Sequence, residues 1–237
     1  YKKGQSILVE GDTISKIIPA RQAVKLRRQV DLVYDASVRS GVVVMPGFVN
    51  AHAHPPMYLL RSTTLLHNHQ ATTEEALHVA RKVERAMHLS DQTIAALGDF
   101  TEQQKFGTTT VLSHYHTPVA TTVAAQQAYI RLVDAISVAS KTDPSANIAT
   151  ATKALRTKHT LLTHGITIHT LERVTLRELQ TVQKWLARHP KLILTIHCGE
   201  TLAEVEAIMH KNQLRQVELL AKAKLLSQRL NLSHALN

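Results

Sequence analysis

Short apolar runs alternate with longer amphipathic segments along most of the chain. The runs with the composition of strands are residues 42–49, 108–112, 165–169, 191–197 and 229–234. The segments with helical character are residues 72–89, 91–105, 119–139, 145–158 and 214–224, with two further helices beginning after Thr175 and Thr201. The third of these segments also holds a candidate short strand at 135–139. Strands that alternate with helices of this length are typical of βα units, so the pattern predicts an α/β fold with a parallel sheet.

Several of the predicted helices begin with a recognisable cap. A Thr followed three residues later by Glu, the spacing of a capping box, occurs at Thr72 and Glu75, at Thr175 and Glu178, and at Thr201 and Glu204. Ser90 is the expected cap of helix 91–105, which Gly107 ends. These local signals fix where the helices start more firmly than the apolar periodicity does.

The N-terminal part of the chain has a different pattern. Residues 6–10 and 13–18 are rich in β-branched side chains and flank the turn pair Gly11-Asp12. Two such runs around a two-residue turn predict a β-hairpin. Residues 30–34 are a weaker candidate for a further strand.

Composition narrows the class of protein. A chain of 237 residues with 44% hydrophobic content can bury a sizeable core, as one large or two small domains. No apolar run approaches the ~18 residues of a transmembrane helix, and no signal peptide is expected. A single cysteine, Cys198, excludes an internal disulfide and is taken as a packing residue. We therefore expect a cytoplasmic protein with no membrane partner.

The formal charge of +10 raises the question of a nucleic-acid partner. Lysine and arginine are scattered, mostly over the predicted helix faces, and the densest group is residues 25–28. Aromatic residues make up only 4% of the chain, so there is no stacking platform for single strands. We expect no nucleic-acid partner.

The end of the run 42–49 carries the clearest candidate chemistry. His52 and His54 stand two residues apart, so on a strand both imidazoles point to the same side. Two converging imidazoles make half of a divalent metal site. The alternative is a pair of polar loop histidines, because the chain has fifteen histidines and a bare His-x-His pair is not specific.

Two further strand ends carry titratable side chains. His197 ends the apolar run 191–197, and Glu200 follows it. A carboxylate beside a metal site can move a proton; alternatively, Glu200 complements the dipole of the next helix. His114 and His116 form a second His-x-His pair, which we expect to line a pocket or to be solvated rather than to bind metal.

Several segments together resemble the amidohydrolase superfamily, and within it the aminohydrolase branch of S-adenosylhomocysteine, guanine and cytosine deaminases and triazine chlorohydrolases. Residues 45–54, followed by Met57 and residues 59–61, resemble its first barrel strand. Residues 106–111 resemble the entry into its second strand, 197–201 its fifth strand, and 217–234 the approach to its sixth.

The resemblance implies an incomplete (β/α)8 TIM barrel at residues 47–237, holding strands one to about six, and part of a small β-sandwich domain at residues 1–46. Active sites of such barrels lie at the carboxyl ends of the strands. The implied metal ligands are His52, His54 and His197. The implied catalytic residues are Glu200, as proton shuttle, and His234, which orients the nucleophile. The implied substrate-binding residues are His169, Met57 and Arg61.

The resemblance also implies the reaction, in which one divalent metal activates water for hydrolysis of a non-peptide C–N bond. We expect zinc, with iron as the alternative, and a single ion because the lysine of two-metal members has no counterpart. The expected substrate is a small heterocycle, most simply a purine or pyrimidine that loses its amino group. The alternative functions are a chlorohydrolase or cyclic-amide hydrolase on the same scaffold and a catalytically incomplete binding protein. A homo-oligomer is also possible.

The chain has no candidate for the family's eighth-strand aspartate. We therefore expect the sequence to be a piece of a longer enzyme, and residues 1–237 alone not to form an active, stable monomer, because six strands cannot close an eight-stranded barrel.

Overall fold

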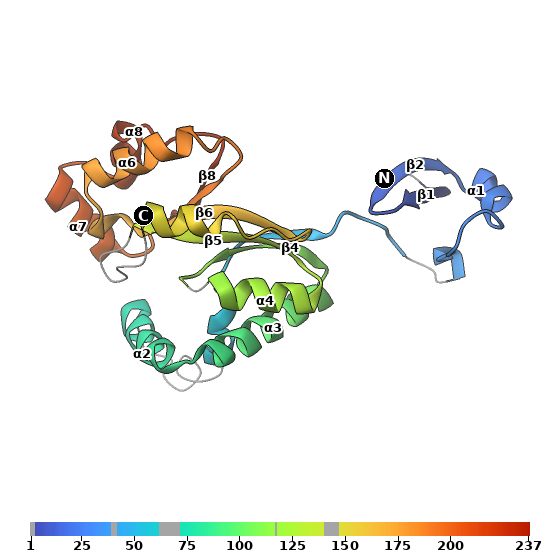
Figure 1. Cartoon of the computed structure of the whole chain (residues 1–237), viewed down its shortest axis with the longest axis horizontal. Coiled ribbons are helices and arrows are strands. Elements are labelled where there is room, and N and C mark those ends of the chain that lie inside the picture. The colour runs from blue at the N-terminus through green and yellow to red at the C-terminus, as the bar shows by residue number, and fades with distance from the viewer. Residues whose placement is uncertain (1–2, 39–41, 62–71, 117, 140–146) are drawn as a thin grey trace. The chain divides into compact units, whose positions relative to one another are not determined.

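The structure is a computed structural model that describes residues 3–38, 42–61, 72–116, 118–139 and 147–237. The chain divides into two compact units, Tyr1–Pro46 and Gly47–Asn237, which are considered separately below (Figure 1). None of the helices in the described ranges is long and apolar enough to cross a membrane.

The first unit contains the predicted hairpin. Strand β1 (Gln5–Glu10) pairs antiparallel with β2 (Thr13–Pro19), and the short helices α1 (Ala20–Leu26) and η1 (Ala36–Val38) follow. The hairpin prediction is confirmed. The prediction of a strand at 30–34 is wrong, since Leu32 and Tyr34 are 86% and 80% exposed and the described sheet of this unit has only β1 and β2. Apolar composition alone does not produce a strand where the described sheet offers no neighbouring strand to pair with it.

The second unit is a partial (β/α) barrel. Its sheet has six parallel strands in chain order: β3 (Phe48–Ala53), β4 (Thr108–His114), β5 (Arg131–Ala139), β6 (Leu162–Thr170), β7 (Leu194–Cys198) and β8 (Leu230–His234). The helices are η2 (Pro55–Leu60), α2 (Thr73–Ala86), α3 (Leu89–Lys105), α4 (Pro118–Ala128), α5 (Ile148–Ala154), η3 (Leu171–Arg173), α6 (Leu176–Ala187), α7 (Leu202–Asn212) and α8 (Gln216–Lys222). Figure 1 shows α3 and α4 on one side of the sheet and α6 and α8 on the other.

Two of the three predicted capping boxes form in full; at the third, the Thr201 hydroxyl accepts the N–H of Glu204, but the Glu204 carboxylate accepts the N–H of Glu200 and not that of Thr201. The hydroxyls of Thr72 and Thr175 accept the backbone N–H groups at the starts of α2 and α6, and the glutamates three residues later bond back. Ser90 does not cap α3. That helix begins two residues earlier, at Leu89, because the Asp91 carboxylate accepts the backbone N–H of His88 at 2.8 Å.

Three segments differ clearly from their predicted bounds. Residues 42–49 are not a buried strand: β3 begins only at Phe48, whose N–H bonds to Gly107, and Val44 is 66% exposed. The reason is that β3 is an edge strand that pairs with β4 alone, so nothing in the described sheet covers the run before it. Residues 119–139 divide into α4 and the strand β5, of which the sequence predicted only the part 135–139. Helix α5 covers only part of 145–158, and residues 145–146 lie outside the described ranges.

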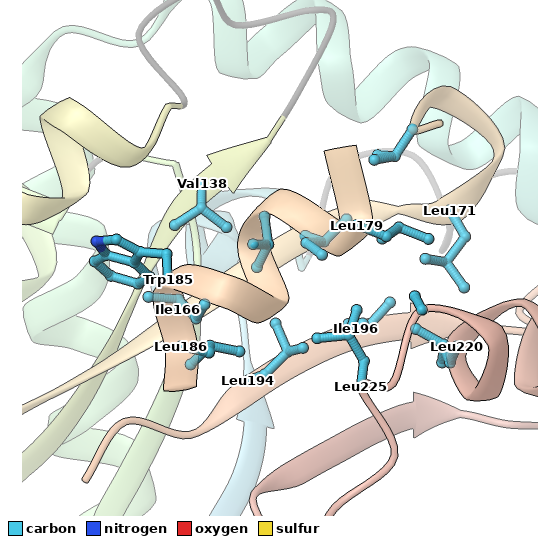
Figure 2. Close-up of a cluster of buried hydrophobic side chains, with 14 of the residues drawn as sticks. Val138, Ile166, Leu171, Leu179, Trp185, Leu186, Leu194, Ile196, Leu220 and Leu225 are labelled. Carbon is cyan, nitrogen blue, oxygen red and sulfur yellow. The ribbon is translucent and has the colours of Figure 1, made fainter. Parts of the chain in front are cut away.

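Two hydrophobic cores lie between the sheet and its helices. The larger one packs α6 and α8 against β5 to β7 (Figure 2). Its fully buried side chains include Ile166, Ile168, Leu179, Ile196 and Leu220. The smaller core packs α3 and α4 against β4 and β5 through Phe100, Val111, Ala124 and Leu132. The apolar side chains of each strand thus point toward the helices.

This arrangement decides which residues point to the inside of the curved sheet. Side chains alternate along a strand, so the residues between the apolar ones face inward. On β6 and β7 these are Thr167, Thr195 and His197, which are all buried. On β8 they are Asn231 and Ser233. The interior of the barrel is therefore lined by hydroxyl and imidazole groups at the carboxyl ends of its strands.

The sheet curls until its two edge strands meet. The side-chain amide of Asn231 on β8 donates to the carbonyl of Ala51 on β3 at 3.1 Å. Two residues further along β8, the hydroxyl of Ser233 lies 2.8 Å from Nδ1 of His52, the next residue of β3. These contacts bring the first and last strands of the unit together at the end where the histidines lie.

One buried carboxyl group lies between the sheet and α4. Asp134 on β5 is 1% exposed, and its two oxygens accept hydrogen bonds from Thr121 and Thr122 at 3.0 and 3.2 Å. Burial raises the pKa of Asp134 to about 7, and the two hydroxyl donors only partly oppose this shift. The folded protein therefore holds this proton more tightly than the unfolded chain does.

We expect the substitution Asp134→Asn to change how stability depends on pH. Because the folded pKa lies above the unfolded one, the wild type loses stability as pH rises from about 4 to about 7. The variant lacks this loss, so its free energy of unfolding relative to wild type should rise across that window by up to about 4 kcal/mol. Urea unfolding of both proteins across the window measures the difference, with the exposed Asp31→Asn as control. Parallel stability curves would contradict the assignment.

Candidate metal centre

Three histidines converge at the carboxyl end of the sheet. His52 is on β3, His54 follows directly after it, and His197 is on β7. One ring nitrogen from each lies within 4.8 Å of those of the other two. The ring centroids of His52 lie 4.8 and 4.9 Å from those of His54 and His197. The structure thus brings together all three residues that the sequence marks as metal ligands.

Hydrogen bonds hold the outer side of two of these rings. Nδ1 of His52 lies 2.8 Å from the Ser233 hydroxyl, and the backbone of His114 bonds to the ring of His54. Nε2 of His52 and Nε2 of His197 are buried and have no hydrogen-bond partner in the described part of the chain. Buried polar atoms are normally paired, so two unpaired imidazole nitrogens at one point fit a bound divalent ion.

The electrostatics of the cluster agree with that fit. Burial, with a smaller contribution from His234, lowers the pKa of His52 to about 4. Burial and the neighbouring imidazoles lower the pKa of His54 to about 3, and they lower that of His197 as well. All three rings are therefore neutral near pH 7, which is the form that binds metal. A neutral imidazole with a free Nε2 is a ligand to zinc or iron.

Glu200 and His234 adjoin this cluster. Gly199, with φ of 62°, turns the chain after β7 and brings Glu200 alongside His197. Nε2 of His234 lies 3.8 Å from a Glu200 oxygen, and ligand atoms of His197, Glu200 and His234 lie within 4.8 Å of one another. His234 ends β8 with φ of 71°, a conformation that non-glycine residues seldom adopt.

The alternative role of Glu200, as the acidic residue of the helix start, falls to another residue. The first turn of α7 contains Glu204, whose carboxylate accepts the backbone N–H of Glu200 at 3.2 Å. Thr201 is the cap of this helix, and its hydroxyl accepts the N–H of Glu204. The Glu200 carboxylate is thus left directed toward the histidines rather than toward the helix.

His114 is part of the cluster, although the sequence predicts only that it lines a pocket or is solvated. It is 1% exposed at the end of β4, and its ring stacks on that of His197 at 4.1 Å and 10°. Its Nε2 lies 2.7 Å from the hydroxyl of Thr167. His116 is exposed, stacks on Tyr115 and lines the same cavity as His114, but it is not one of the clustered rings. The two histidines differ because β4 ends at His114, so His116 lies beyond the strand, and nothing in the sequence marks that end.

The remaining predicted residues lie in different places. His169 lies 5.0 Å from the His197 ring and lines a cavity of about 410 Å³ together with His114 and Tyr115. Met57 lies in η2, which directly follows His54. Arg61 forms an ion pair with Glu102 and lines a separate pocket that none of the cluster histidines lines. The structure therefore brings His169 to the candidate site and does not bring Arg61 there.

Comparison with known protein families identifies the fold. A model of the amidohydrolase family matches residues 43–234, which include every residue of the cluster. This chain belongs to the amidohydrolase family. No curated protein sequence matches it at a significant level.

Solved structures resemble this amidohydrolase over nearly all of its length. A zinc-bound adenosine deaminase from Xanthomonas campestris is 21% identical with a TM-score of 0.75, and 97% of this chain matches 52% of that one. Atrazine chlorohydrolase from Arthrobacter aurescens, complexed with zinc, is 18% identical with a TM-score of 0.76, and 98% of this chain matches 56% of that one. E. coli guanine deaminase is 13% identical with a TM-score of 0.71, and 98% of this chain matches 56% of that one. At these identities the likeness shows the fold, and the chain spans about half the length of the proteins it matches.

Proposed function

We propose that this amidohydrolase is part of a metal-dependent hydrolase that deaminates a purine, pyrimidine or related heterocycle. The observation that carries the proposal is the convergence of three neutral imidazoles, two of them with a buried and unpaired Nε2. The family and the similarity to an adenosine and a guanine deaminase support it. We also propose that Tyr1–Pro46 is part of a β-sandwich domain of the same enzyme.

In this proposal His52, His54 and His197 hold one divalent ion, with zinc favoured because two similar structures contain it. The ion, when bound, supplies a Lewis acid that makes water a nucleophile at neutral pH. Burial and the surrounding rings keep the three imidazoles unprotonated, so they stay available as ligands at the pH where the reaction runs.

Glu200 and His234 act on the proton and on the nucleophile. The Glu200 carboxylate takes a proton from water and passes it to the leaving nitrogen, while the water oxygen bonds to the ring carbon. The C–N bond breaks and ammonia leaves. His234, whose Nε2 lies 3.8 Å from Glu200, orients the nucleophile. His169, on the wall of the 410 Å³ cavity, contacts the heterocycle.

The test measures metal content and product release together. The full-length enzyme of which this chain is proposed to be a part is loaded with zinc, and ammonia release is followed over a panel of amino-substituted purines, pyrimidines and triazines. Chloride release from chlorinated triazines is followed in parallel, because a chlorohydrolase shares this fold. Ammonia release that depends on bound zinc supports the proposal. Chloride release alone, or ligand binding without turnover, would overturn it in favour of a chlorohydrolase or a binding protein.

A further inference from the structure

The ring of His52 is held from one side by a single residue of the opposite edge strand. Ser233 lies on β8, is 5% exposed and points to the inside of the sheet. Its Oγ lies 2.8 Å from Nδ1 of His52, although the two residues are 181 positions apart in the chain. Nε2 of the same ring is buried and unpaired in the described residues. Nδ1 of His52 therefore has a hydrogen-bond partner, whereas Nε2 has none among the described residues.

We propose that Ser233 is a positioning residue that fixes both the orientation and the tautomer of His52. The inference rests on the function proposed above, because it concerns how a ligand of that site is prepared. A neutral imidazole carries one N–H, on either Nδ1 or Nε2. When Nδ1 carries it and donates to the Ser233 oxygen, the lone pair of Nε2 faces His54 and His197 and is free for a metal ion.

The other contacts of the His52 ring do not make this choice. Its neighbours His54, His114, His197 and His234 contact it edge-on, with centroids 4.8 to 5.4 Å away. Such contacts restrict the plane of the ring but leave the proton on either nitrogen. The Ser233 hydroxyl can accept a hydrogen bond from Nδ1–H, whereas a proton on the buried Nε2 would have no acceptor in the described residues, so the two nitrogens are not equivalent.

A second buried serine provides a matched control. Ser113 on β4 is 0% exposed, and its Oγ has no hydrogen-bond partner in the described chain. It pairs in register with Asp134, whose side chain bonds to α4, so it faces the helices and not the histidines. Ser113→Ala removes a hydroxyl from an equally buried strand position without touching the cluster.

The experiment compares the zinc affinity of Ser233→Ala, Ser233→Thr and Ser113→Ala by competition with a chelator at neutral pH. Loss of a group that orients a metal ligand typically costs about 10–100-fold in affinity, and we expect the lower end for a neutral hydroxyl. Ser233→Thr keeps the hydroxyl and should restore most of the affinity, and Ser113→Ala should bind zinc like wild type. Equal losses in both alanine variants, or no loss in Ser233→Ala, would overturn the proposal.

A spectroscopic readout separates this inference from the proposed function. Ring ¹⁵N shifts of His52 in the zinc-free wild type should report a proton on Nδ1, and in Ser233→Ala a mixture of the two tautomers. A proton on Nε2 in the wild type would overturn the positioning role, even if zinc binds. A wild type that binds no zinc but shows the Nδ1–H tautomer would overturn the metal site and leave the role of Ser233 standing. The wild-type spectrum decides the question even if an alanine variant fails to fold.

Discussion

Replacing His197 by asparagine is expected to remove zinc from the protein and to abolish turnover. His197 belongs to each of the three groups of possible metal ligands at this site, together with His52 and His54, with His114 and His169, and with Glu200 and His234. Its buried Nε2 has no other partner in the described chain. Loss of a group that only orients a metal ligand lowers metal affinity by up to about 100-fold, so loss of a direct ligand should lower zinc affinity by more than that.

The measurement is the metal content per chain after dialysis, followed by product release. The control is His210→Asn, which removes an exposed imidazole from α7 and should leave both quantities unchanged. A His197→Asn variant that keeps stoichiometric zinc would show that the cluster binds metal through other residues or that these histidines are not its ligands.

Glu200→Gln is expected to separate metal binding from catalysis. Glutamine has the size of glutamate but cannot take a proton, and Glu200 is not among the three histidine ligands. The variant should therefore keep its zinc and lose roughly 10²–10⁴-fold in turnover, the usual contribution of a general acid or base.

The matched control for this variant is Glu206→Gln, which neutralises an exposed carboxylate on the neighbouring helix α7. The rate should be compared over a range of pH, because loss of the proton-transfer group also removes its limb from the pH–rate profile. A fully active Glu200→Gln variant would mean that Glu200 has only a structural role near the helix start.

Local signals predicted the helices well, while burial had to be learned from the structure. The boxes at Thr72 and Thr175 involve atoms three residues apart, so the sequence contains everything that determines them. The run 42–49 has the composition of a buried strand but is exposed, because burial depends on which distant elements cover it. Similarly, only residues 135–139 of β5 were predicted as a strand, because no Gly or Pro separates its first residues from the preceding helix α4.

The candidate site divides in the same way. His52 and His54 could be placed together because two-residue spacing on one strand fixes their relation. His114 was expected to line a pocket or to be solvated, because the pair with His116 does not show that the strand ends at His114 and that only His114 joins the cluster. The hydroxyl of Ser233 carried no signal at all, since its partner is 181 residues away and only the curvature of the sheet brings them together.

The meeting of β3 and β8 also sets an order of events during synthesis. The contacts from Asn231 and Ser233 to β3 span 180 and 181 residues, so they can form only after β8 has been made. Closing so long a loop is costly in entropy and slows folding. At ~5–20 residues per second, His52 is made on the order of 10–40 s before Ser233. A nascent chain therefore exposes His52 and His54 as a chelate of two imidazoles. The site that also contains His197 and the contact from Ser233 can bind a metal ion only after β8 has been made.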